Sequence, residues 1–252
     1  MTISAGILYP GYSAHDDYPV LEQLLGADVA LPLVHTEMRE DAHRVDALLD
    51  VGGPDVLADG ARELLGQHEV GSLVWACTSG SFVFGRAGAR DQVERLQQVA
   101  QLPVSSTSFA FEHAAQQLGL SRVAVAATYP ADVADRFVQF LSGAGLEVVR
   151  MSSRGIVTAA EVGTLRREQV LEFAAVNDDE RAEAVLLPDT ALHTAGWLQE
   201  LEQQVGKPVL TANQVSAWEG LRLAGEVGRR PGLGSVFGGG VAATGQRGVS
   251  RG

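Results

Sequence analysis

The chain has 252 residues, of which 46% are hydrophobic and 20% are charged, and this composition is typical of a globular protein. Its formal net charge of -12 argues against nucleic acid or an anionic membrane surface as a partner. One cysteine excludes an internal disulfide framework, and no apolar run approaches the roughly 20 residues of a membrane span. Because the start also lacks the basic end of a signal peptide, we expect a cytoplasmic protein.

Apolar runs and helical spacing alternate through the first half of the chain. The predicted strands are residues 3–9, 27–34, 72–76 and 103–106. The predicted helices are residues 17–25, 54–68 and 89–100, and one after the last strand that ends at Leu118. Such an alternation is typical of βα units with parallel strands.

The second half repeats this order. Strands are predicted at residues 122–128, 146–151, 184–187 and 207–211, with helices at 131–142 and 160–176 and a last helix that ends near Gly225. Three short motifs recur in register, at offsets of about 105 to 120 residues. They are Tyr9-Pro10 with Tyr129-Pro130, Ala76-Cys77-Thr78 with Pro188-Asp189-Thr190, and residues 102–106 with 207–211.

The repeat predicts a duplicated α/β fold of two Rossmann-like lobes, each a mostly parallel four-stranded sheet flanked by helices. Residues 1–119 form the expected N-terminal lobe and residues 120–225 the C-terminal lobe. Residues 226–252 are rich in glycine and are expected to be a flexible tail, since a phosphate loop at residues 232–240 would need a strand before it and a helix after it. Strand ends of both lobes should face one cleft.

Cys77 is the first candidate for chemistry. It follows a predicted buried strand and precedes Thr78, Ser79 and Gly80, which favour a loop that leads to a helix. A helix start lowers the pKa of a thiol and so favours the nucleophilic thiolate. The alternative is a small buried apolar residue, a frequent role of free cysteine.

Asp189 takes the place of Cys77 in the second half. An aspartate before a helix is often only its N-cap, but here helical spacing resumes only near Thr194. In a closed cleft beside an anionic substrate, the pKa of this carboxyl should rise, so we expect a group that can donate a proton.

Hydroxyl groups complete the predicted site. Tyr9 and Tyr129 each end a first strand, and we expect the phenol of Tyr129 to donate to a substrate oxygen rather than to lie on the rim. The hydroxyl and N–H groups at Thr78, Ser79 and Thr190 are expected to hold a carboxylate.

Other chemistries are disfavoured. The one lysine, Lys207, lies at the wrong end of a strand for a pyridoxal site. Residues 11–15 are similar to a nucleophile elbow but lack its last glycine. His35 and His43 flank three acidic residues without the spacing of a metal site, and we expect a solvated helix face there. We therefore expect neither a metal nor a cofactor.

The motifs around Cys77, Tyr129 and Asp189, with residues 207–214, resemble the aspartate/glutamate racemase superfamily and, within it, maleate cis-trans isomerase and arylmalonate decarboxylase. The resemblance covers about residues 3–225. It implies two lobes related by a pseudo-twofold axis, an active site between them, no cofactor and a homo-oligomer, a dimer or a tetramer.

The resemblance also assigns roles. Cys77 matches the nucleophilic cysteine of maleate isomerases, and Asp189 stands where their second cysteine handles the proton. In arylmalonate decarboxylase the second cysteine remains and glycine replaces the first. Thr78, Ser79 and Tyr129 match substrate-binding positions of the decarboxylase, and Ser13 and Thr158 lie where maleate isomerases have substrate-binding asparagines.

Three hypotheses result. The first is a cofactor-independent cis-trans isomerase or racemase for a small carboxylate or dicarboxylate, with Cys77 as nucleophile or base and Asp189 as the opposing acid or base. The second is a malonate-type decarboxylase in which Cys77 donates the proton. The third is a protein that binds a small carboxylate without catalysis.

Overall fold

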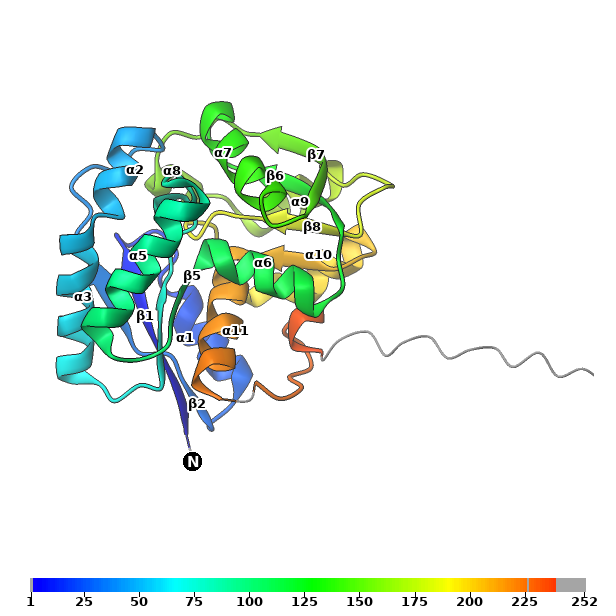
Figure 1. Cartoon of the computed structure of the whole chain (residues 1–252). Coiled ribbons are helices and arrows are strands. Elements are labelled where there is room, and N and C mark those ends of the chain that lie inside the picture. The colour runs from blue at the N-terminus through cyan, green and yellow to red at the C-terminus, as the bar shows by residue number, and fades with distance from the viewer. Residues whose placement is uncertain (1, 226, 239–252) are drawn as a thin grey trace, which may run out of the picture.

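The computed structural model describes residues 2–225 and 227–238, which form two parallel sheets with helices packed around them (Figure 1). In the first sheet β1 is central, with β2 and β3 on one side and β4 and then β5 on the other. The bounds of these strands are β1 Ile3–Pro10, β2 Val29–Ala30, β3 Leu33–Thr36, β4 Ser72–Trp75 and β5 Val104–Ser106.

The second sheet has the order β7-β6-β8-β9, so the first strand of each half lies inside its sheet, β1 beside β4 and β6 beside β8. Every strand pair is parallel. The bounds are β6 Arg122–Ala127, β7 Glu147–Ser153, β8 Ala184–Leu187 and β9 Val209–Thr211. The predicted α/β fold with two parallel sheets is thereby confirmed.

One predicted strand, residues 27–34, is divided into β2 and β3. Pro32 lies between them and has no N–H to donate to a sheet. Its carbonyl still accepts the N–H of Ile7 at 2.8 Å, so both pieces stay beside β1. The two short strands therefore together take the place of the one predicted strand.

Helices cover both sheets. In the first half α3 and α5 pack against each other beside the first sheet (Figure 1). In the second half α7 packs on β7, and α9 packs on α10. The helices are α1 Asp17–Leu25, α2 Val45–Val51, α3 Pro54–Gln67, α4 Ser79–Phe82, α5 Gly85–Ala100, α6 Thr107–Gln117, α7 Ala131–Ser142, α8 Ala159–Gly163, α9 Arg167–Val176, α10 Leu198–Val205 and α11 Ala212–Ala224.

Helix α11 joins the two halves. It belongs to the second half in sequence but packs on β1 and β4 of the first sheet and on α6. Gly220 permits the close approach, since a Cβ there would lie 2.8 Å from the Cβ of Ala5. On the α6 side, the buried carboxylate of Glu219 accepts hydrogen bonds from His113 at 2.7 Å and from Arg222 at 2.8 Å. The division at residues 119 and 120 remains a prediction, and the packing of α11 crosses it.

The helix predicted over residues 160–176 is two helices, α8 and α9. The hydroxyl of Thr164 donates to the carbonyl of Glu161 at 2.7 Å and ends the first of them. The main-chain N–H of Arg166 donates to the side chain of Gln169 at 3.0 Å, a capping interaction that starts the second. Local capping therefore overrides the continuous helical spacing.

The expected flexible tail is wrong for residues 227–238. Leu233, Val236 and Phe237 are buried, because these three apolar side chains fill space beside α11. Gln214 donates to the carbonyl of Leu233 at 2.7 Å. Residues 239–252, including the end of the glycine-rich segment 232–240, lie outside the described residues.

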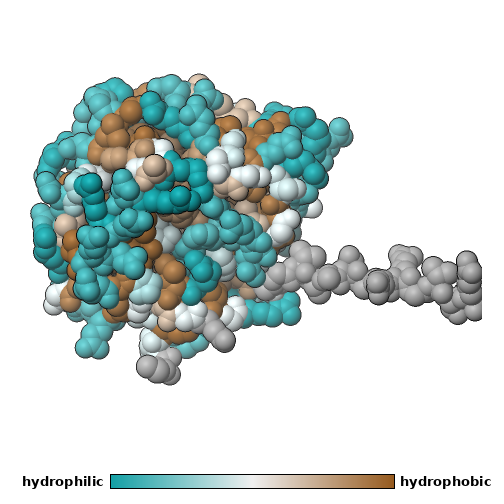
Figure 2. Space-filling view, in the orientation of Figure 1, coloured by the Kyte–Doolittle hydropathy of each residue, from teal (hydrophilic) through white to brown (hydrophobic). Residues whose placement is uncertain are grey.

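The surface is polar with scattered apolar area. Figure 2 shows hydrophilic residues over most of the face in view, with small hydrophobic areas between them, a mixture that is normal for folded proteins. Within residues 2–225 and 227–238, none of the helices has the length and apolar character that a membrane span requires.

Candidate active site between the two sheets

Cys77 and Asp189 occupy equivalent places in the two halves. Each follows a fully buried strand, β4 or β8, by two residues, so each leaves the carboxyl end of its sheet. Both side chains line one small cavity of about 30 Å³ between the halves. The structure thus brings together the two side chains that the sequence repeat pairs.

The thiol of Cys77 is almost completely buried, with 5% of the residue exposed. It accepts a hydrogen bond from the N–H of Gly80 at 3.3 Å and lies 3.9 Å from the hydroxyl oxygen of Ser79. Burial raises the pKa of this thiol to about 11, and the nearby Asp189 carboxylate acts in the same direction, while the hydrogen bonds from Gly80 and Ser79 oppose it. Cys77 is therefore a neutral thiol at neutral pH in this closed cavity.

Asp189 accepts hydrogen bonds on both of its side-chain oxygens. The hydroxyl of Thr128 donates to Oδ2, and the N–H of Ala191 donates to Oδ1 at 2.9 Å. The residue is 4% exposed. These two donors hold the carboxyl of Asp189 in place at the cavity, and its role in proton transfer remains a prediction.

Two tyrosines fix the main chain around Asp189. The hydroxyl of Tyr9 donates to the carbonyl of Thr190 at 2.8 Å, and that of Tyr129 donates to the carbonyl of Pro188 at 2.8 Å. Burial raises the pKa of both phenols. Tyr9 lines the cavity, whereas Tyr129 is fully buried behind it, and a contact between Tyr129 and substrate remains a prediction.

The other predicted substrate-binding residues divide into two groups. Ser13, Ser79 and Thr190 line the cavity. Thr78 is fully buried behind it, and its hydroxyl oxygen has no hydrogen-bond partner among the described residues. Thr158 caps α8 by accepting the N–H of Glu161 at 3.2 Å, so its hydroxyl is used within its own helix.

The roof of the cavity could not be predicted from the sequence. It consists of residues 38–43 and α2, of which Met38, Glu40, Asp41, Ala42, His43, Leu48 and Val51 line the cavity. The expectation of a solvated face at this segment is wrong for His43, which is 8% exposed and contacts the carbonyl of Ile156 through Nδ1 at 2.9 Å. No periodic pattern in the sequence marks this contact.

Asp41 ties the roof to the second half. Its two side-chain oxygens accept the N–H groups of Ala159 at 2.7 Å and Ala160 at 2.9 Å, at the start of α8. The N–H of His43 donates to the carbonyl of Val157 at 2.8 Å. A carboxylate is favoured at a helix start, because the first N–H groups lack partners within the helix.

The charges around the cavity are acidic. Glu40, Asp41 and Asp189 line it, and none of its described lining residues is a lysine or an arginine. Among residues 2–225 and 227–238, no group of three or more histidine, cysteine, aspartate and glutamate side chains is placed as the ligands of a metal ion would be. The lining residues whose side chains carry O–H or N–H groups are Tyr9, Ser13, His43, Ser79 and Thr190.

Comparison with known proteins assigns the chain to a family. A family model described as arylmalonate decarboxylase matches residues 54–237. The chain belongs to the arylmalonate decarboxylase family. It is 31% identical to the arylmalonate decarboxylase of Bordetella bronchiseptica over 166 residues, which is 64% of this chain and 68% of that relative. It is 24% identical to a maleate isomerase of Alcaligenes faecalis over 191 residues, 73% of this chain and 76% of that relative.

Solved structures of this family and of its isomerase relatives have the same fold. A liganded variant of arylmalonate decarboxylase, with a glycine changed to cysteine and a cysteine changed to serine, superposes with a TM-score of 0.80 at 25% identity over 94% of this chain and 99% of that one. A cysteine-to-alanine variant of the maleate isomerase Iso of Pseudomonas putida S16, with maleate, gives a TM-score of 0.84 at 20% identity over 95% of this chain and 98% of that one. The resemblance to this branch is thereby confirmed, and these relatives are enzymes.

Proposed function

We propose that this chain is a cofactor-independent isomerase of the racemase type, which exchanges a proton at the carbon next to the carboxylate of a small acid. The observation that carries the proposal is the shared cavity of Cys77 and Asp189, one from each half. Racemisation needs an acceptor on one face of the carbon and a donor on the other. The substrate would lie between these two side chains.

The raised pKa of Cys77 supports proton transfer rather than addition of a thiolate to a double bond. A thiol pKa of about 11 lies about four units above neutral pH, so only about one molecule in ten thousand would hold the thiolate, an unfavourable state by about 5 kcal/mol. The neutral thiol is instead a ready donor. We therefore assign Asp189 as base and Cys77 as acid, the reverse of the first expectation for Cys77.

In the proposed reaction one proton leaves the substrate carbon and one is returned to it. Asp189 takes the proton from the carbon, the electron pair remains on the substrate as an enolate, and Cys77 gives its proton to the opposite face. The cycle ends with the acid form of Asp189 and the thiolate of Cys77. Exchange with solvent, or the same step in reverse, restores both groups.

The walls of the cavity favour a substrate with one carboxylate. Two unit charges of the same sign about 4 Å apart cost about 1 kcal/mol in water and several times more in a dry site. Because the lining residues include Glu40, Asp41 and Asp189, a second carboxylate on the substrate would meet repulsion without a lysine or arginine among the described lining residues to offset it. Ser79 and Thr190 are the proposed donors to the single carboxylate.

The substrate cannot enter this closed form. A cavity of about 30 Å³ holds one or two water molecules. The roof, residues 38–43 with α2, is the segment that we expect to move, because Asp41 and His43 join it to the second half by a few hydrogen bonds and by one edge-on contact between the His43 and Tyr129 rings. We propose that binding opens these contacts and that they re-form over the substrate.

The test is incubation in D2O with single enantiomers of 2-substituted carboxylic acids and hydantoins, and with maleate and arylmalonates, followed by NMR. For the wild type we expect deuterium to be incorporated next to the carboxylate and optical activity to be lost. Neither deuterium incorporation nor racemisation should occur with Cys77→Ala or Asp189→Asn. Full activity of Cys77→Ala would reject the proposal.

A second candidate is decarboxylation of a malonate-type acid. The family match and the neutral thiol favour it, because a decarboxylase needs only one proton donor to the enediolate that remains after CO2 leaves. The same spectra separate the two functions: release of CO2 from an arylmalonate identifies the decarboxylase, and an unchanged carbon skeleton identifies the isomerase.

A further inference from the structure

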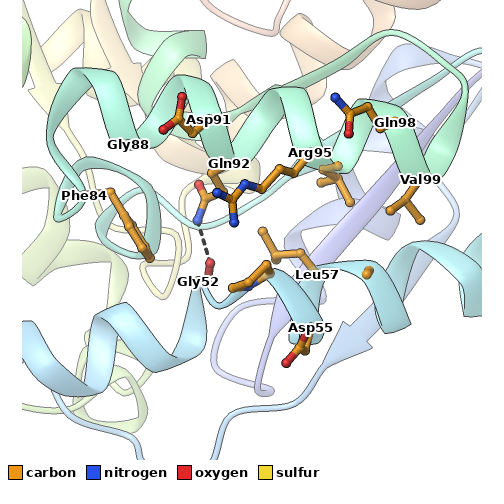
Figure 3. A pocket seen from close by; sticks show the side chains of 13 residues that line it. Gly52, Asp55, Leu57, Phe84, Gly88, Asp91, Gln92, Arg95, Gln98 and Val99 are labelled. Carbon is orange, nitrogen blue, oxygen red and sulfur yellow. Dashed lines mark hydrogen bonds between the residues drawn. The ribbon is translucent and has the colours of Figure 1, made fainter.

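A second hollow, separate from the cavity of Cys77 and Asp189, is a groove on the surface of the first half. It has a volume of about 510 Å³ and runs between α3 and α5, with Leu57 and Val99 on its two sides (Figure 3). Gln92 of α5 lines it and is 8% exposed. The groove is larger than the cavity of Cys77 and Asp189, but the side chains with the proposed chemistry lie in the smaller one.

The amide of Gln92 connects two turns of main chain. Its Nε2 donates to the carbonyl of Gly52 at 2.8 Å, drawn in Figure 3, and to the carbonyl of Gly80 at 2.9 Å. Its Oε1 is buried and has no hydrogen-bond partner among the described residues. A buried carbonyl without a partner is unfavourable, so an amide here is explained by what its NH2 group holds.

Each end of this connection leads to the substrate cavity. Gly80 belongs to the four-residue helix α4, and its own N–H donates to the sulfur of Cys77 at 3.3 Å. Gly52 caps α2, whose Val51 lines the roof of the cavity. The two turns also touch directly, since a Cβ at Gly52 would lie 2.1 Å from the carbonyl oxygen of Gly80.

We propose that Gln92 is a positioning residue for Cys77: by binding the carbonyls of Gly80 and Gly52 it sets the place of α4 and so aims the Gly80 N–H at the sulfur. A helix of four residues has little internal stability, so an external anchor decides its position. The importance of this anchor for turnover rests on the proposed function, but its effect on the thiol does not.

The experiment uses the single cysteine of the chain, because any thiol alkylation then reports on Cys77 alone. The rate of reaction of the whole protein with iodoacetamide is measured from pH 7 to pH 12 for the wild type, Gln92→Met and Gln98→Met. Gln98 is the matched control, because it lies exposed on α5 in the same groove and has no side-chain contact with Gly52 or Gly80.

In Gln92→Met we expect the midpoint of the profile to rise by about half a pH unit or more, because the Gly80 hydrogen bond that stabilises the thiolate is lost. Gln98→Met should match the wild type. With the acid that shows deuterium exchange, kcat of Gln92→Met should fall about tenfold with KM within about twofold. Coincident profiles of all three proteins would overturn the proposal.

If Gln92→Met does not fold, as judged by circular dichroism, the pH profile of alkylation is measured for Gln92→Asn instead and compared with the wild type and Gln98→Met. Asparagine keeps the amide but shortens its reach by one bond, so it should not bind both carbonyls, and the same shift is expected. A normal profile in folded Gln92→Asn would overturn the proposal. Turnover by Cys77→Ala would instead reject the proposed function and leave this result unaffected.

Discussion

Tyr9 and Tyr129 hold the main chain on the two sides of Asp189, one through the carbonyl of Thr190 and the other through that of Pro188, each at 2.8 Å. The two tyrosines are equivalent in the sequence repeat, yet both act on the same loop of the second half. The carboxyl of Asp189 is thus fixed from both lobes, whereas Cys77 is fixed through α4.

Tyr129→Phe should therefore weaken both stability and activity. The carbonyl of Pro188 would lose its buried donor, and we expect a loss of about 1 to 3 kcal/mol in the free energy of unfolding. Activity should fall because the loop of Asp189 becomes mobile. Urea denaturation measures the loss of stability, and kcat measures the loss of activity. Tyr12→Phe is the control: its side chain is 70% exposed, so neither stability nor kcat should change.

The thiol of Cys77 should make stability depend on alkaline pH. Its pKa is about 11 in the folded chain, against an ordinary value near 9, so the folded state holds this proton more tightly than the unfolded state. The resulting stability is fully present below about pH 9 and is lost as pH rises to about 11, by about 2 to 3 kcal/mol.

Urea denaturation of the wild type and of Cys77→Ala at several pH values between 8 and 11 measures this loss. The wild type should lose more than the variant, because the other titrating groups are common to both. A constant difference between the two proteins would contradict the raised pKa.

Glu219 should produce the opposite dependence at acid pH. Burial alone would raise the pKa of its carboxyl, but hydrogen bonds from His113 and Arg222 outweigh burial and lower the pKa to about 2. Stability from this group is present above about pH 4.5 and is lost as pH falls toward 2, by about 3 kcal/mol. Glu219→Gln should show a flatter acid profile in thermal denaturation, and an equally steep one would refute the assignment.

Asp41→Ala should loosen the roof of the cavity. The N–H groups of Ala159 and Ala160 would lose their acceptor, so closure over the substrate becomes less favourable by about 1 kcal/mol and KM rises several-fold. Steady-state kinetics on the acid found by deuterium exchange tests this. Asp59→Ala removes an exposed carboxylate that pairs with Arg62 on α3, outside the roof, and it should leave KM unchanged.

The sequence predicts the frame of this molecule well. Tyr9-Pro10 and Tyr129-Pro130 mark equivalent strands, and helix α1 begins and ends at the predicted residues. The strands before Cys77 and Asp189 are apolar runs, as expected for buried parallel strands. The structure does bring those two side chains to one cavity, while their roles stay predictions.

The parts of the structure that could not be predicted depend on contacts between residues far apart in the sequence. Asp41 meets Ala159, which is 118 positions away, and no local pattern records that contact. Helices α2 and α4 have seven and four residues, too few for a helical period to be distinguished from chance. Among the glycines after residue 226, Leu233 and Phe237 are spaced without a period, yet both are buried.

The position of α11 has a consequence for how the chain can be divided. This helix comes after the whole second sheet in sequence, yet it is the layer that keeps β1 and β4 from water. A fragment that ends at residue 119 would leave one face of β1 and β4 without α11, and a nascent chain completes the cover of its first sheet only after α11 has been made. The cover of the first sheet thus comes from a helix that follows the second sheet in the chain.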